Sequence, residues 1–412
     1  MSPRPRVAYA LGVIALTALL VPPGWVVLAA VVVVVACGVD VVVARDTPLV
    51  ERSAPHVVAR GVPAPAVLEA GGGLRTVVRQ PCTAELVMEP QQAVRRVEGA
   101  LTGLRRGRHT LPAPAVRVDG PLGLGCWYRR SGEDAEVIVY PDVPQARRLA
   151  RAAKRGQLST EGRRRGPLGL GTEFESVRDY QQDDDVRQIN WRATQRMGRP
   201  MSNQYRVERD RDVVCLIDCG RLTAAPLGDK TRLDVALDAA VAVAETADEL
   251  GDRVGAIAFD SAVIRALPPR RRGARAVLAS VFDLEPRPVD SDYRRAFAAV
   301  SEGKRALVLV FTDLIEDAAA RPLLDAIPVL ARRHAVVVAS VADEELEELV
   351  VQEPLRVVDV YRAVAAGDVL SARDRVVTAL RHVGADVVTA GAAAFPAACV
   401  RSYVRMKARG LF

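Results

Sequence analysis

A nearly continuous run of apolar residues opens the chain and extends from Val7 to Ala44, with one break at Pro22-Pro23-Gly24. The part after the break begins at Trp25 and, at about 1.5 Å per helical residue, is long enough to cross the hydrocarbon core of a bilayer. The part before the break ends at Val21 and is short for a span, so it would need a thinned bilayer or the proline segment to cross. This pattern predicts an N-terminal transmembrane helical hairpin over residues 1–48.

Basic residues flank the predicted hairpin on both sides, whereas its turn carries no charge. Arg4 and Arg6 precede the hairpin, and Arg45 follows it closely. Because basic residues are retained on the cytoplasmic side of a membrane, we expect a multi-pass protein of the cell inner (plasma) membrane with its soluble domains in the cytoplasm. A cleaved signal peptide is the alternative, but the second apolar segment would then act as a stop-transfer sequence. Asp40 lies inside the apolar run, and we expect it near the lipid headgroups beside Arg45 rather than at an intramembrane proton site.

After the hairpin the pattern changes to short apolar runs separated by Gly and Pro, which extend over residues 49–142. Runs of this size between turn residues are typical of strands, and no segment with the length and period of a helix interrupts them. They predict a small antiparallel β-sandwich domain. Residues 143–204 follow as a linker and a polar segment, and the linker includes a charged helix from Gln145 onward.

Apolar strands alternate with helical segments over residues 205–412. Fully apolar strands that alternate with helices indicate a parallel sheet covered on both faces. The sequence therefore predicts a doubly wound α/β domain, in which ligands bind at the carboxyl ends of the strands. The predicted strands are 213–217, 254–259, 307–311, 336–341 and 385–388, and the predicted helices are 233–250, 322–333 and 372–383.

Two of these strands end in a carboxylate, the first in Asp218 and the third in Asp313. The stretches at 218–222 and 311–314 resemble the metal-binding strand ends of von Willebrand A domains. In that family a D-x-S-x-S motif, with a later Thr and Asp, holds a divalent cation through oxygen ligands. The resemblance implies a von Willebrand A-like fold for the C-terminal α/β domain.

Gly220 and Leu222 stand where that family has its two Ser ligands, so two oxygen donors are missing. The resemblance therefore implies at most a weakly bound, mostly hydrated Mg²⁺ at Asp218 and Asp313, and no other cofactor is expected. Further oxygen ligands for this ion would come from Ser291 or Thr312. Alternatively, both carboxylates cap helices or loop amides at the edge of the sheet.

The polar segment from Gly171 to Trp191 is the most specific stretch of the chain. It resembles the signature of a bacterial family known as domain of unknown function 58, which reads roughly E-F-x-x-L-R-x-Y-x-x-G-D-D-x-R-x-I-x-W. Asp183 stands where that family has Gly. Residues 105–107, 120–124 and 403–407 are also similar, so the resemblance covers nearly the whole chain. The matching signature residues are Glu173, Phe174, Arg178, Tyr180, Asp184, Asp185, Arg187, Ile189 and Trp191.

The resemblance implies a partner, because members of this family are commonly encoded beside MoxR-type AAA+ ATPases, but it implies no established activity. Two interpretations of the signature remain open. It could clamp the fold by internal ion pairs, with Tyr180 and Trp191 buried against the β domain. It could instead be a docking surface whose charges set the register of a partner. The candidate partner-binding residues are Glu173, Arg178, Tyr180, Asp184, Asp185, Arg187 and Trp191.

Composition narrows the function further. The net charge is +7, but aromatic residues make up only 4% and do not interleave with the Arg clusters, so a nucleic-acid partner is not expected. The six Cys residues form no C-x-x-C pair, which argues against a zinc site or a disulfide framework. No nucleophile or phosphate-binding motif is present. We therefore expect a membrane-tethered scaffold or adaptor for complex assembly or maturation rather than an enzyme, the alternative being a metal-dependent hydrolase that uses the strand-end carboxylates.

Overall fold

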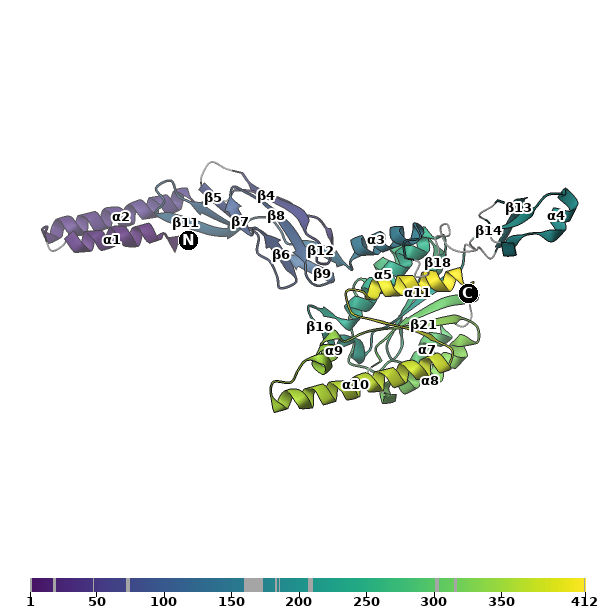
Figure 1. Cartoon of the computed structure of the whole chain (residues 1–412). Helices are drawn as coiled ribbons and strands as arrows, with labels where there is room; N and C mark the ends of the chain where they lie inside the picture. Colours follow the sequence, from purple (N-terminus) through teal and green to yellow (C-terminus); the bar gives the residue numbers. More distant parts are fainter. Residues whose placement is uncertain are drawn as a thin grey trace. The chain divides into compact units, whose positions relative to one another are not determined.

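The computed structural model describes residues 2–17, 20–46, 48–71, 75–158, 173–181, 184, 186–206, 210–300, 304–314, 317–410 and 412. The chain divides into two compact units, Met1–Tyr140 and Pro141–Phe412 (Figure 1). Each unit has its own buried core, and each is described below by itself.

Two apolar helices, α1 (Pro5–Thr17) and α2 (Pro23–Val43), lie side by side at the start of the first unit (Figure 1). Each begins at a proline, which is favourable in the first turn because its missing N–H would have no helical partner there. With 21 residues and a mean hydropathy of 3.0, α2 is long and apolar enough to cross a membrane. The 13 residues of α1 are not. The described helices thus provide one candidate span, not the two that a multi-pass hairpin requires.

The remainder of the first unit is made of strands that share one buried core. Three sheets have the strand orders β1-β11-β10-β5-β7, β2-β4-β8-β6 and β3-β12-β9. Their pairings are antiparallel except for that of β12 with β3. The strands are β1 (Ser2–Pro3), β2 (Val50–Ser53), β3 (Val57–Ala59), β4 (Ala64–Ala70), β5 (Arg75–Arg79), β6 (Leu86–Glu89), β7 (Gln92–Val94), β8 (Arg96–Gly103), β9 (Gly107–Leu111), β10 (Ala115–Asp119), β11 (Gly125–Arg130) and β12 (Ala135–Tyr140).

The second unit is built on a six-stranded sheet with the order β19-β18-β15-β20-β21-β22. Five strands are parallel, and β19 pairs antiparallel with β18 at one edge. The five parallel strands are those predicted from the sequence, whereas β19 was not predicted. The strands are β15 (Asp212–Asp218), β18 (Arg253–Phe259), β19 (Val263–Arg271), β20 (Ala306–Phe311), β21 (Ala335–Val341) and β22 (Asp386–Ala390), with a separate two-stranded ribbon of β16 (Pro226–Leu227) and β17 (Lys230–Thr231).

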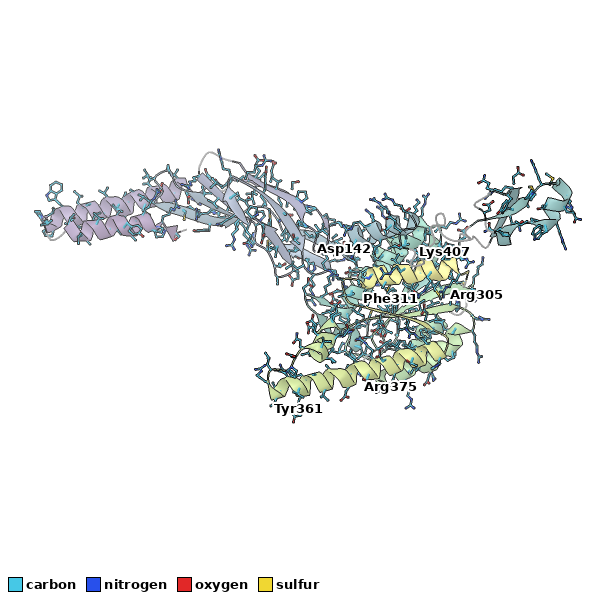
Figure 2. The ribbon with its side chains drawn as sticks, in the orientation of Figure 1. Asp142, Arg305, Phe311, Tyr361, Arg375 and Lys407 are labelled. Atoms are coloured by element: carbon cyan, nitrogen blue, oxygen red, sulfur yellow. The ribbon has the colours of Figure 1, made fainter. Side chains whose placement is uncertain are left out.

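Helices cover both faces of this sheet, because successive side chains of each strand point to opposite sides. One core cluster joins Cys215 and Ile217 of β15 and Phe311 of β20 to α3, α5, α6 and α11 (Figure 2). The other joins Leu216 of β15 to α7, α8 and α10. The helices are α3 (Val143–Lys154), α5 (Arg232–Glu249), α6 (Ala274–Val281), α7 (Tyr293–Ala298), α8 (Asp317–Ala331), α9 (Glu344–Val351), α10 (Val357–His382) and α11 (Phe395–Ala408).

Candidate functional site

The two strand-end carboxylates lie at the same edge of the sheet. Strands β15 and β20 pair in parallel, with Ile217 opposite Phe311, so Asp218 and the Thr312-Asp313 pair leave the sheet at neighbouring positions. Both carboxylates are buried, with 2% of Asp218 and 5% of Asp313 exposed. A buried carboxylate needs hydrogen-bond donors or a cation, so its partners show what it can still bind.

Asp218 already has four donors from the chain itself. Its Oδ1 accepts from the backbone N–H of Gly220 at 2.8 Å and from the hydroxyl of Ser291. Its Oδ2 accepts from Thr312 Oγ1 at 2.7 Å and from the Tyr293 hydroxyl at 3.0 Å. Ser291 and Thr312, which were predicted as cation ligands, are therefore hydrogen-bond donors to the carboxylate in this structure.

Tyr293 keeps its proton in this cluster. Burial and the neighbouring Asp218 carboxylate raise the pKa of Tyr293 well above its usual value. The tyrosine begins α7, whose N-cap Asp292 accepts from the backbone N–H of Arg295. Its ring packs edge-on against Phe259 at 5.6 Å. The hydroxyl is thereby held as a neutral donor on Asp218.

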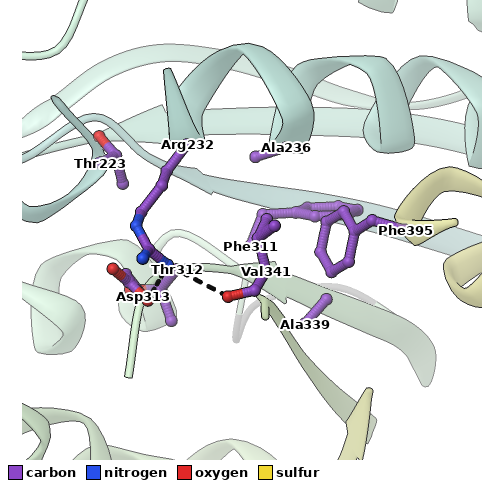
Figure 3. Close-up of a pocket in the computed structure, with 9 residues that line it drawn as sticks. All are labelled: Thr223, Arg232, Ala236, Phe311, Thr312, Asp313, Ala339, Val341 and Phe395. Carbon is purple, nitrogen blue, oxygen red and sulfur yellow. Dashed lines mark hydrogen bonds and ion pairs between the residues drawn. The ribbon is translucent and has the colours of Figure 1, made fainter. Parts of the chain in front are cut away.

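Asp313 is neutralised by two guanidinium groups, of which Figure 3 shows that of Arg232. Arg232, the first residue of α5, and Arg373 in α10 each lie 3.1 Å from its Oδ1. Both arginines also donate to the backbone carbonyl of Val341 at the end of β21. Arg232 makes a second ion pair, at 2.7 Å, with Asp343. Because α5 and α10 cover opposite faces, this cluster fastens both helical layers to the end of the sheet.

The surroundings of Asp313 do not fit a divalent cation. Burial raises the pKa of Asp313, while Arg232 and Arg373 oppose that shift by favouring the charged form. The cavity beside it has a volume of about 10 Å³, which is about one water molecule, and Arg232 forms part of its wall (Figure 3). A Mg²⁺ ion prefers about six oxygen ligands with several waters. Among the described residues, no group of three or more His, Cys, Asp or Glu side chains is placed to hold a metal.

We expect that restoring the missing serines will not create a magnesium site. A Cβ at Gly220 would lie 2.2 Å from Ser291 Oγ and 2.9 Å from the carbonyl of Val289, so Gly220→Ser needs a backbone shift. Overpacking of this kind costs about 1–3 kcal/mol. The doubly substituted Gly220→Ser, Leu222→Ser chain should unfold at lower denaturant and show no heat of Mg²⁺ binding at millimolar metal. Leu222→Ser alone is the control, and tight binding by the double variant would contradict this view of the site.

The signature segment forms a small antiparallel hairpin of its own. Strand β13 (Glu173–Asp179) pairs with β14 (Met201–Arg206), and α4 (Trp191–Met197) lies between them in sequence. Asn190 caps α4 by accepting from the N–H of Ala193 at 3.0 Å. A short 3₁₀ helix, Val186–Gln188, precedes it.

Three candidate residues of the signature come together in this hairpin. Arg178 donates to the Asp184 carboxylate at 2.6 Å, and the Tyr180 hydroxyl donates to the Asp184 carbonyl at 3.3 Å. The backbone N–H of Gln181 is the main cause that lowers the pKa of Asp184, with Arg178 adding to it. The charges at these positions therefore pair with each other.

The remaining candidate residues of the signature do not form a single cluster among the described residues. Trp191 is 69% exposed, and its burial against the β domain stays a prediction. Glu173 lies in β13 and Arg187 in the 3₁₀ helix. Asp185 lies outside the described residues. The exposed indole is available to a partner.

A surface that was not predicted from the sequence lies at the corner between α9 and α10, here called the α9–α10 corner. Its apolar side chains are largely open to solvent, with Leu355 91%, Val351 83%, Val357 75% and Tyr361 72% exposed. Figure 2 shows Tyr361 at the free end of α10. The signal in the sequence is that apolar residues surround the first turns of α10 instead of following one face. The apolar members of the corner are Val350, Val351, Leu355, Val357, Val358, Val360, Tyr361 and Val364.

The α9–α10 corner is joined to the Asp313 cluster by Asp343. One oxygen of Asp343 accepts from the N–H of Leu346 at the start of α9, and the other binds Arg232. The corner is therefore held at the carboxyl edge of the sheet, where ligands of such folds bind.

Residues 176–374 match the family described as "Protein of unknown function DUF58". The DUF58 match begins in the signature hairpin and ends in α10. It includes Asp218, Asp313 and both arginines of the Asp313 cluster. Because that family is described as of unknown function, the match supplies no activity.

Curated relatives of this chain are distant. Uncharacterised proteins of Mycobacterium bovis and Mycobacterium tuberculosis are 27% identical over 188 residues, which is 44% of this chain and 58% of each relative. The chain thus spans little more than half the length of the curated relatives it matches.

Proposed function

We propose that this chain is a membrane-tethered, cytosol-facing scaffold or adaptor whose C-terminal domain is von Willebrand A-like and binds partner proteins. The sheet supports that fold assignment, since it combines five parallel strands with one antiparallel edge strand and has carboxylates at the ends of its two central strands. The helix α2 supports the tether.

The observation that carries the proposal is the exposed α9–α10 corner. Contiguous exposed apolar surface is uncommon on soluble domains and marks sites of association. Aromatic residues such as Tyr361 and the equally exposed Trp191 are enriched among the residues that dominate binding energy. By contrast, the strand-end carboxylates, which a hydrolase would need, already bind hydroxyls and guanidinium groups of the chain.

The proposed partner is an AAA+ ATPase of the MoxR type, or its client, because of the resemblance in the signature segment. The first turn of α9 carries Glu344, Glu345 and Glu347, and Glu348 follows. This acidic rim favours a partner surface that is basic around an apolar centre, and such complementarity raises the rate of association.

Polar substitution in the α9–α10 corner should abolish partner capture without unfolding the domain. We expect that Leu355→Ser with Tyr361→Ser lowers the yield of an ATPase crosslinked in native membranes at least tenfold, since loss of a central anchor costs about 2 kcal/mol or more. Both side chains are more than two-thirds exposed, so stability should change by less than about 0.5 kcal/mol.

The matched control is Val329→Ser, because Val329 is 65% exposed on α8, away from the α9–α10 corner. Crosslinked neighbours are identified by mass spectrometry. An unchanged set of neighbours in the double variant, or none in the unsubstituted chain, would remove the scaffold proposal.

A further inference from the structure

Both ends of the α1–α2 hairpin are fastened to the β-rich part of the first unit. Before α1, β1 pairs with β11 through Ser2 and Cys126, and Arg4 binds the buried Asp119 carboxylate at 3.2 Å. After α2, Ala44 is fully buried in the core of this unit. The hairpin therefore cannot slide along its axis relative to the strands.

Asp40 is the main fastening point of α2. Asp40 is 1% exposed, and its carboxylate accepts hydrogen bonds from three backbone N–H groups, those of Leu122 at 2.8 Å, Leu124 at 2.7 Å and Gly125 at 2.8 Å. A Cβ at Gly120 would lie 2.3 Å from this carboxylate, so the loop can approach only because that residue is glycine. The Asp40 carboxylate is thus bound by backbone N–H groups of the protein, and its position near the headgroups stays a prediction.

The loop that binds Asp40 also covers part of α2, and only the remainder of the helix is free to contact lipid. Cys37 Sγ contacts the carbonyl of Leu124, and the indole N–H of Trp127 donates to the carbonyl of Val41 at 2.5 Å. The last two turns of α2 are therefore partly covered by protein. Trp25, at the other end, is 67% exposed.

The part of the arm beyond the Asp40 loop is shorter than the hydrocarbon core of a bilayer. Pro23, the first residue of α2, and Asp40 are separated by about 26 Å at 1.5 Å per residue, and the whole of α1 is about 20 Å long. The hydrocarbon core of a bilayer is about 30 Å thick. When the Asp40 loop and the exposed Arg6 lie at one boundary of the core, the start of α2 is about 4 Å short of the other boundary, and α1 by its own length is about 10 Å short of it.

Most described residues at the tip of the hairpin, 20–25, have no backbone N–H left without an acceptor. The N–H groups of Leu20 and Val21 both donate to the carbonyl of Thr17, and that of Trp25 donates to the carbonyl of Pro22. Pro22 and Pro23 have no N–H at all. Because an unsatisfied N–H is costly in hydrocarbon, this turn is suited to a position inside the membrane.

We propose that the α1–α2 hairpin enters the bilayer from one side and ends inside its hydrocarbon core, without reaching the opposite headgroups. The ligand of this arm is the acyl region of the membrane, and Arg6 and Arg45 at its base meet the phosphates of the near leaflet. This inference rests on the membrane tether of the proposed function and specifies how that tether enters the membrane. The chain is inserted from one side and does not cross.

Trp25 supplies the probe for this proposal, as one of three tryptophans in the chain. The full chain is reconstituted into vesicles of phosphatidylcholine brominated either near the headgroup or near the chain end. The fluorescence lost in Trp25→Phe isolates the signal of the tip. We expect lipids brominated near the chain end to quench Trp25 at least twice as strongly as those brominated near the headgroup.

The control is Trp191→Phe, which should leave the depth pattern of the Trp25 signal unchanged. Stronger quenching by bromines near the headgroup would place Trp25 at the far boundary and overturn the proposal. Absence of quenching by either lipid in chains that float with the vesicles would also overturn it, because the tip would then be covered by a second copy. A chain that does not float with vesicles would instead remove the membrane tether itself.

Discussion

Replacing Asp252 with alanine should lower the free energy of unfolding of the α/β domain by about 3–5 kcal/mol, because it removes the carboxylate that binds a buried ammonium group. Asp252 is fully buried and binds Lys407 at 2.5 Å, whose side chain is only 1% exposed. The same carboxylate accepts from the Tyr403 hydroxyl at 2.6 Å. Burial and Asp252 raise the pKa of Tyr403 well above its usual value, so this hydroxyl remains a donor.

Hydrogen exchange of the amides in β18 and α11 measures this loss, since Asp252 precedes β18 and Lys407 lies in α11 (Figure 2). Exchange should become faster by roughly two to three powers of ten. Adding Lys407→Met to Asp252→Ala should restore much of the protection, because the stranded charge is then gone. An Asp252→Ala chain that exchanges at the original rate would show that the pair is not buried in solution.

Asp313→Ala should lower the free energy of unfolding by a similar amount, about 3–5 kcal/mol, because it also removes a buried carboxylate from its basic partners. Arg373, with 8% of its side chain exposed, would lose its carboxylate partner. Arg232 would keep Asp343, so most of the cost falls on the attachment of α10. We expect the amides of α10 to lose protection before those of α5, as followed by hydrogen exchange.

Asp290→Ala is the matched control for Asp313→Ala. Asp290 also pairs with an arginine, Arg221, but the two side chains are 82% and 57% exposed. Exposed pairs of this kind contribute about 0–1 kcal/mol. If the two variants lost equal amounts of unfolding free energy, burial would not explain how much the Asp313 cluster contributes to stability.

The five parallel strands were predictable because each is apolar on both faces, as in β15, where all seven residues are buried. The edge strand β19 was missed for an equally physical reason. It contains Pro268 and Pro269, which lack the N–H that a central strand needs, and only an edge position tolerates them. In the sequence, the segment of β19 therefore resembles a loop.

Helix α10 is longer than its pattern suggests. The prediction covered 372–383, whereas the helix begins at Val357. Its first half has apolar residues around the whole circumference and therefore no helical period to detect. That half is also where the exposed α9–α10 corner lies. The same feature that hid the helix marks its proposed surface for a partner.

The proximity of Asp218 and Asp313 was predictable from strand order, but their partners were not. Arg232 and Arg373 lie 81 and 60 residues from Asp313 in sequence, and nothing local links them. Asp40 shows the same limit, since its donors are 82 to 85 residues away. Hydrogen bonds and ion pairs between residues so far apart in sequence can be identified only from the folded structure.

The continuity of α2 has a mechanical consequence. The helix runs from the apolar tip at Pro23 to Val43 without interruption, and its last turns are bound to the strands that follow. A helix bound in this way cannot rotate relative to the strands. In the proposed membrane-inserted state, the β-rich part of the first unit should therefore keep one angle to the membrane plane, and a force that tilts the strands should be transmitted to the lipid by a rigid helix.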